Sequence, residues 1–177
     1  MTPRPDVPCD NTSIGVIITD SQDRYLLIDR ATAPFGMAPV AGHIDQHGGP
    51  EFAARNEVRE EVGLTVVSLR QLSETWLPNS CRRPAGPEGI GHYWTLYQAT
   101  FAGQIQMAAD EVRAVQWADR TDLQTLAERA IANARIGFAD QSVYEKPVLQ
   151  SVWVLLLASQ SLISASAADL AIFDLPH

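Results

Sequence analysis

Residues 42–64 read GHIDQHGGPEFAARNEVREEVGL, and this stretch carries most of what the chain reveals about its fold. It begins as a glycine-rich loop and continues as a helix. Pro50 suits the first helical position, because the N–H that proline lacks would be unpaired there in any residue. Gly63 suits the position just after the last turn, where glycine adopts a left-handed backbone without strain. The segment therefore predicts a loop followed by a helix that ends before Gly63.

Three carboxylates lie within this predicted helix, at Glu57, Glu60 and Glu61. The spacing i, i+3, i+4 places them on one face. Like charges so spaced destabilise a bare helix by roughly 0.2–0.5 kcal/mol per pair, whereas Mg²⁺ prefers oxygen ligands of this kind. A solvated acidic face is the commoner explanation of such a pattern. The adjoining glycine-rich loop and the well-marked helix ends favour a metal site.

The segment resembles the Nudix box, written G-x5-E-x7-R-E-U-x-E-E-x-G-U with U aliphatic. Gly48 stands where the box has Glu, and Asn56 stands where it has Arg. In the family these two residues pair and brace the loop against the helix. Because both are replaced together, no charge is left buried alone, and we expect a looser loop with tuned or reduced activity. Seven positions match in register: Gly42, Glu57, Val58, Glu60, Glu61, Gly63 and Leu64.

The resemblance implies Mg²⁺ or Mn²⁺ as cofactor, held by Glu57, Glu60, Glu61 and the backbone near Gly42. Such a metal polarises a phosphoryl oxygen and activates a water molecule. Glu111 is the best candidate for a general base outside the box, with a surface acid at a strand entry as the alternative. The implied activity is Mg²⁺-dependent hydrolysis of a nucleoside diphosphate linked to another moiety, at a phosphoanhydride bond.

Substrate recognition is less well marked. Residues 78–91 are rich in glycine and proline and predict an irregular loop. Arg82 and Arg83 in this loop could capture phosphate, or they could be solvated charges. Trp94 could stack on a nucleobase, although large aromatic residues in strands more often belong to the core. His43 lies near the expected site and could bond phosphate, although a loop histidine is more often solvated.

Two other functions remain open. The departures at Gly48 and Asn56 are compatible with a catalytically weak or inactive Nudix-like module that binds a nucleotide or regulates a partner. A diphosphate isomerase of the isopentenyl type shares the fold. It is disfavoured because Cys81, the candidate catalytic thiol, lies in a Gly/Pro loop.

Composition and charge limit the binding partners and the cellular compartment that we expect for the protein. The chain has 177 residues and a net charge of −8, which argues against non-specific binding to nucleic acid. Cys9 and Cys81 form no CxxC pair and favour a reduced, intracellular protein. The most apolar run, residues 152–158, is too short to span a bilayer, and the N-terminus lacks a signal peptide's apolar core. We expect a cytoplasmic protein with a small nucleotide or diphosphate substrate and no nucleic-acid or membrane partner. The apolar helix expected at residues 147–161 is compatible with a homodimer.

Strands interleaved with about three helices predict an α+β or α/β sandwich. The resemblance to the Nudix family implies an α+β fold, an α/β/α sandwich with a mixed sheet between helices. Residues 1–12 form a flexible lead-in, 13–160 a single domain, and 161–177 a tail that docks on the same chain or on a partner. Val66, Val67 and Leu69 are core candidates, and Trp117 is assigned to the core. Strands are expected at 13–19, 24–29, 40–42, 64–74, 92–101 and 111–117, and further helices from a capping box at Thr121 and at 147–161.

Overall fold

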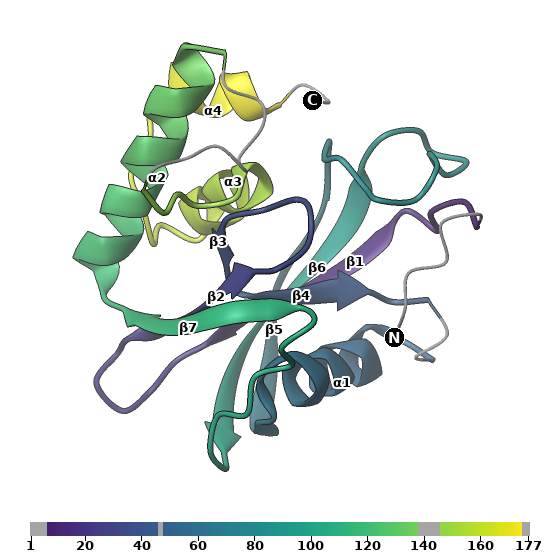
Figure 1. Ribbon diagram of the computed structural model, residues 1–177. Coiled ribbons are helices and arrows are strands. Elements are labelled where there is room, and N and C mark those ends of the chain that lie inside the picture. Colours follow the sequence, from purple (N-terminus) through teal and green to yellow (C-terminus); the bar gives the residue numbers. More distant parts are fainter. Residues whose placement is uncertain (1–6, 46–47, 138–145, 175–177) are drawn as a thin grey trace.

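Two β-sheets form the centre of the protein in a computed structural model that describes residues 7–45, 48–137 and 146–174 (Figure 1). In the larger sheet β1 runs parallel to β6, and the other pairings are antiparallel. All pairings in the smaller sheet are antiparallel. The larger sheet has the order β4 (Val40–His43), β1 (Thr12–Ile18), β6 (His92–Ala102), β5 (Thr65–Leu77), and the smaller has β3 (Met37–Ala38), β2 (Tyr25–Arg30), β7 (Val112–Ala118).

Helices cover these sheets on two sides (Figure 1). Side chains alternate across a strand, so Ile14 and Val16 of β1 pack towards the first helix, whereas Ile17 packs with the other helices. This arrangement confirms the predicted α/β/α sandwich of the α+β class. The first helix, α1 (Pro50–Val62), lies on one side, and α2 (Arg120–Arg135), α3 (Ser151–Ser159) and α4 (Ala167–Phe173) lie on the other.

The first helix has the ends that the sequence predicts. Pro50 occupies its first turn, and Gly63 follows its last turn in the left-handed conformation, with φ 69°. Its residues Ala54, Val58 and Val62 are fully buried on the face that packs against the sheet. Burying a valine side chain contributes about 1.5–3 kcal/mol, so this apolar face holds the helix against the sheet and leaves the carboxylates of the neighbouring face towards β4.

Two helix starts differ from the prediction. The capping box of α2 begins at Asp119 and not at Thr121. The Asp119 carboxylate accepts the Asp122 N–H at 2.9 Å, and the Asp122 carboxylate accepts the Asp119 N–H at 3.1 Å. Asp is a stronger N-cap than Thr, so the reciprocal pair sets the boundary. The third helix begins at Ser151 and not near Pro147. Residues 148–150 lie extended beside Met37, because the Met37 N–H donates to the Val148 carbonyl at 2.8 Å and the Met37 carbonyl accepts the Gln150 N–H at 3.0 Å.

Burial along β5 and β7 corrects two expectations. Val67 is 63% exposed, whereas Val66 is 8% exposed, because successive side chains of a strand point to opposite faces. Leu69 is partly buried against the core cluster that lies beneath α1. Trp117 is only partly buried. Its ring stacks on Phe101 with centroids 5.5 Å apart at the margin of the core.

The C-terminal segment docks on its own chain. Phe173 of α4 is 4% exposed and belongs to the same core cluster as residues of α2 and α3. Docking the tail on the same chain was one of the two expectations for it. Among the described residues, no helix is both long enough and apolar enough to cross a membrane.

Candidate functional site

A pocket of about 440 Å³ gathers acidic and basic side chains from distant parts of the chain. Its carboxylates are Glu57, Glu60 and Glu61 of α1, Glu111, which precedes β7, and Asp45, which follows β4. Every residue proposed from the sequence for metal, catalysis or substrate lines this pocket: Gly42, His43, Glu57, Glu60, Glu61, Arg82, Arg83, Trp94 and Glu111. The structure therefore brings together residues that span much of the chain.

Close contact between β4 and α1 positions the carboxylates. A Cβ atom on Gly42 would lie 2.0 Å from Oε1 of Glu57, so only glycine leaves room for that carboxylate. The backbone N–H of Ala41 lies 3.4 Å from Oε2 of Glu61. The glycine of the strand and the acids of the helix thus form one packed unit.

Burial makes the carboxyl groups of Glu57 and Glu61 hard to ionise. Burial, followed by repulsion from Glu61 and Glu111, raises the pKa of Glu57 to about 8. Burial also raises the pKa of Glu61 to about 7, although Arg30, 3.6 Å away, opposes the change. Glu61 is only 2% exposed. Crowded, desolvated carboxylates of this kind fit a hard divalent cation such as Mg²⁺ or Mn²⁺, which supplies the missing positive charge. Glu57, Glu60 and Glu61 are the residues that would hold it.

Three arginines form a positive side of the pocket. Arg30 follows the apolar run of β2 and was not anticipated, although a charge at the end of a buried strand is a usable signal. Its Nε atom is buried without a hydrogen-bond partner among the described residues. Burial and the nearby Arg30 lower the pKa of Arg82. Arg83 is already paired, since its two terminal nitrogens donate to the Asp45 carboxylate at 2.6 Å each. Arg30 and Arg82 are therefore the better candidates for contact with an anion.

Two residues proposed for substrate contact are engaged with other side chains. Trp94 is 5% exposed, donates its indole N–H to Asn79 at 3.1 Å, and meets Trp153 edge-on. It forms part of the pocket wall. His43 places its Nε2 3.4 Å from the sulfur of Cys9 and 3.3 Å from that of Cys81.

The two departures from the box lie on either side of the helix start. The Asn56 side chain accepts a bond from Arg59 at 3.1 Å. Gly48 has φ +80° and open space around its Cβ position. Arg55 donates to the carbonyl of Val66 at 3.0 Å and so turns towards β5. The looser loop predicted here stays a prediction, because residues 46–47 lie outside the described residues.

Comparison with known proteins places the chain in a family. The NUDIX domain model matches residues 10–139. Two curated relatives are NAD-capped RNA hydrolases called NudC: one from Mycobacterium tuberculosis, 25% identical over 144 residues, and one from Mycobacterium bovis, 27% identical over 146. Each alignment covers 77% of this chain and 46% of the relative, so the chain spans about half their length.

A solved structure shares the fold. A NUDIX-family hydrolase from Clostridium perfringens superposes with a TM-score of 0.56 at 19% identity, over 86% of this chain and 95% of that one. The chain belongs to the NUDIX family. The predicted membership of the Nudix family is confirmed.

Proposed function

We propose that the protein hydrolyses a nucleoside diphosphate linked to another moiety, with Mg²⁺ or Mn²⁺ held by Glu57, Glu60 and Glu61. The observation that supports this most directly is the pocket itself, which is lined by five carboxylates and three arginines. Without a metal, the acids would repel a diphosphate. When bound, the cation supplies charge neutralisation and Lewis-acid polarisation of the phosphate.

The residues of the chain have distinct roles in this proposal. Arg82 and Arg30 bind phosphate oxygens, because phosphoryl transfer depends chiefly on positioning and charge neutralisation. Glu111 accepts a proton from the attacking water, since it lines the pocket beside the helix carboxylates. Glu57 and Glu61 are held by their packing against Gly42 and Ala41.

The relatives suggest which diphosphates to try. NAD consists of two nucleosides joined by a diphosphate, and NudC is named for hydrolysis of NAD-capped RNA. An RNA-linked substrate is partly at odds with the expectation of no nucleic-acid partner. A net charge of −8 still disfavours non-specific RNA binding, so contact with RNA would be confined to its capped end.

A substrate panel with and without Mg²⁺ tests the proposal. It contains NAD, NAD-capped RNA, dinucleoside and nucleotide-sugar diphosphates, and isopentenyl diphosphate. Phosphate or nucleotide release is the readout for hydrolysis, and the position of the double bond, followed by NMR, is the readout for isopentenyl diphosphate. Glu60→Gln and Glu61→Gln are expected to lower turnover by about 100-fold or more, as does loss of one electrostatic catalytic group. Glu51→Gln is the matched control, an exposed carboxylate on the same helix that does not line the pocket.

Each alternative has its own outcome in this panel. Unchanged turnover in the Glu60 and Glu61 variants would show that the metal-hydrolase proposal is wrong. Tight binding of a diphosphate that never turns over would identify a binding module instead. Cys81 does line the pocket, so double-bond migration in isopentenyl diphosphate would identify an isomerase.

A further inference from the structure

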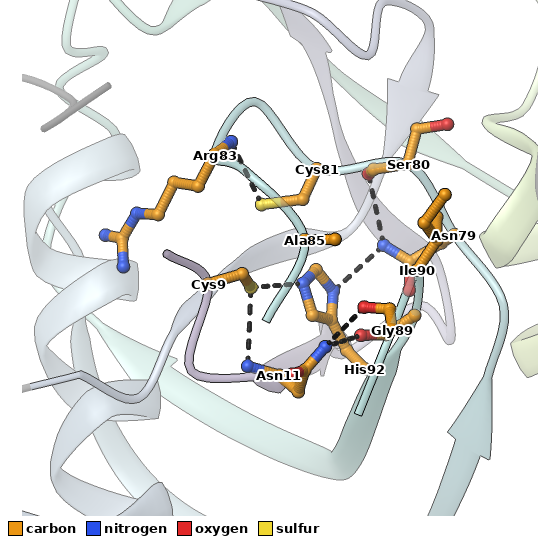
Figure 2. Close-up of a pocket in the computed structure, with 11 residues that line it drawn as sticks. Cys9, Asn11, Asn79, Ser80, Cys81, Arg83, Ala85, Gly89, Ile90 and His92 are labelled. Carbon is orange, nitrogen blue, oxygen red and sulfur yellow. Dashed lines mark hydrogen bonds between the residues drawn. The ribbon is translucent and has the colours of Figure 1, made fainter. Parts of the chain in front are cut away.

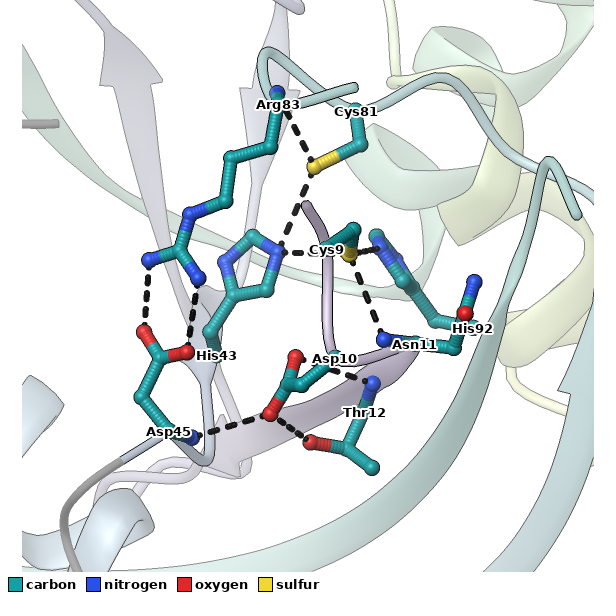
Figure 3. A network of polar contacts seen from close by, with 9 residues as sticks. All are labelled: Cys9, Asp10, Asn11, Thr12, His43, Asp45, Cys81, Arg83 and His92. Carbon is teal, nitrogen blue, oxygen red and sulfur yellow. Dashed lines mark hydrogen bonds and ion pairs between the residues drawn. The ribbon is translucent and has the colours of Figure 1, made fainter. Parts of the chain in front are cut away.

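A second group of side chains lies beside the carboxylate pocket and is chemically different from it. Cys9, His43, Cys81 and His92 each direct one ligand atom inwards, and the four atoms all lie within 4.8 Å of one another (Figure 3). They come from four separate segments: the N-terminal stretch, the end of β4, the β5–β6 loop and the start of β6. Neither the carboxylate site nor the proposed hydrolysis uses the two thiols.

The distances suit a tetrahedral metal ion. The Cys9 sulfur lies 3.4 Å from Nε2 of His43 and 2.9 Å from Nε2 of His92, and the Cys81 sulfur lies 3.3 Å from Nε2 of His43. Zn²⁺ bound at about 2.3 Å to sulfur and about 2.0–2.1 Å to nitrogen separates its ligand atoms by about 3.3–3.8 Å. Because the four atoms all lie within 4.8 Å of one another, changes of about 1 Å or less in their separations would complete that geometry.

The immediate surroundings suit two thiolates. The Cys9 sulfur accepts the backbone N–H of Asn11 at 3.3 Å, and the Cys81 sulfur accepts that of Arg83 at 3.4 Å. In both cases the donor lies two residues beyond the cysteine. Such bonds stabilise a coordinating sulfur and orient it. Two thiolates and two neutral imidazoles would also balance the charge of a divalent cation in this cluster, in which Cys9 and His92 are buried and His43 and Cys81 are partly buried.

Polar contacts tie the ligand-bearing segments together (Figure 3). Asp10, next to Cys9, accepts the backbone N–H of Asp45 at 3.2 Å. Asp45 in turn holds Arg83 of the Cys81 loop through two bonds of 2.6 Å. The segments that carry Cys9, His43 and Cys81 are thereby connected by a chain of hydrogen bonds that does not involve the ligand atoms.

Zinc binding by His92 requires the Asn79 side chain amide to turn over. The Asn79 amide nitrogen lies 2.9 Å from Nδ1 of His92 (Figure 2). With metal on Nε2, Nδ1 carries the proton, so Asn79 must present its oxygen there, which exchanges the two ends of its amide. Trp94 would then lose the acceptor of its indole N–H. Such exchanges are common in amide assignments, and the contact supplies the outer partner that a ligating histidine needs.

We propose that Cys9, His43, Cys81 and His92 bind one Zn²⁺ ion in a structural site. The ligand set is soft and suits zinc, whereas carboxylates suit Mg²⁺, so the two neighbouring sites would select different metals. Because the protein fills all four positions, no position is left for a reacting water. The ion anchors residue 9 and the 78–91 loop to the larger sheet.

This anchoring would act on the proposed active site. Cys81, Arg83 and His92 line both the carboxylate pocket and a second pocket of about 200 Å³, which Figure 2 shows. The cluster therefore borders both pockets. Fixing Cys81 also fixes its neighbour Arg82, so the consequence for substrate binding rests on the proposed function, whereas zinc binding itself does not.

Metal analysis of the full chain tests the proposal independently of activity. The protein is purified in reducing buffer with any affinity tag removed, and its metals are measured by mass spectrometry. One Zn²⁺ per chain is expected. Replacement by Co²⁺ is expected to give the intense visible bands of a tetrahedral site, with thiolate-to-cobalt charge transfer. Absence of zinc together with an octahedral or absent Co²⁺ spectrum would overturn the proposal.

Variants identify the ligands. Cys81→Ser and His92→Ala are expected to weaken zinc binding more than about 100-fold, since losing an outer partner alone costs about 10–100-fold. Glu57→Gln is the control and is expected to keep its zinc. Full zinc occupancy in the Cys81 variant, or a Cys9–Cys81 disulfide in the freshly reduced protein, would contradict the assignment. If the variants do not fold, the Co²⁺ spectrum of the unaltered chain still decides it.

Discussion

Replacing Gly42 with alanine separates the function of the carboxylate site from the stability of the fold. The new Cβ would lie 2.0 Å from Oε1 and 2.1 Å from Cδ of Glu57, whereas unstrained contacts lie near 3.5 Å. The carboxylate must therefore move by roughly 1.5 Å. A misplacement of about 1 Å can cost about 100-fold in rate, equivalent to about 2.7 kcal/mol. Turnover of Gly42→Ala is expected to fall by that factor.

The fold is expected to tolerate this change. Gly42 is not among the residues with positive φ, and the atoms that must move belong to the end of a flexible side chain. Alanine in a strand interior is favoured over glycine by about 0.5–1 kcal/mol, which offsets the displacement. Thermal unfolding and the Mg²⁺ dependence of kcat and KM, measured on the same preparation with the substrate that the panel identifies, test both halves of the expectation.

Gly15→Ala is the matched control, because it is expected to lower stability and to leave turnover by the folded protein unchanged. Its Cβ would lie 2.6 Å from the Trp153 ring, which is fully buried. Overpacking of this kind costs about 1–3 kcal/mol and lowers Tm by about 2–4 °C per kcal/mol for a chain of this size, while turnover by the folded protein persists. Normal turnover in Gly42→Ala, or a loss of turnover that merely follows its unfolded fraction, would refute the reasoning.

Three further changes address binding and stability. Arg82→Ala removes a charge-assisted contact worth about 1.5–3 kcal/mol, so KM is expected to rise by about 10–100-fold in steady-state assays, with the exposed Arg70→Ala as control. Asp119→Ala removes the N-cap of α2 and is expected to cost about 0.5–2 kcal/mol in urea unfolding without changing kcat. Phe173→Ala empties the contact of α4 with the core and is expected to cost about 3–5 kcal/mol in the same measurement.

Each of these has a clear contrary result. An unchanged KM in the Arg82 variant would place phosphate contact elsewhere in the pocket. A stability loss in Asp119→Ala no larger than that of Thr121→Ala would show that the helix is capped differently. Stability unchanged in Phe173→Ala would show that α4 contributes nothing to the core.

Local pattern was a good guide wherever local chemistry sets the structure. Pro50 and Gly63 bound the first helix because their backbone preferences do not depend on distant contacts. Local pattern gave the wrong helix start where two residues could each serve as N-cap or where a distant segment bonds to the backbone. Asp119 displaced Thr121 as the N-cap because it completes a reciprocal pair. Residues 148–150 are kept out of α3 by their backbone bonds to Met37, a residue far away in the sequence.

The sequence by itself determined the carboxylate face of residues 42–64 and, through the match to the box, the family and its sandwich fold. Helical periodicity alone aligns Glu57, Glu60 and Glu61. Only the tertiary structure decided what faces them. Arg30 and Arg82 reach the carboxylates through the pairing of β2 and the course of the 78–91 loop.

The cysteine–histidine cluster shows the same limit more strongly. Its ligands at residues 9, 43, 81 and 92 have no short spacing that a motif could reveal. They meet because β1 pairs with both β4 and β6, which carries the N-terminal segment and His43 to the strand that begins at His92. Strand pairing over such sequence separations is a property of the whole sheet, so no local pattern encodes it.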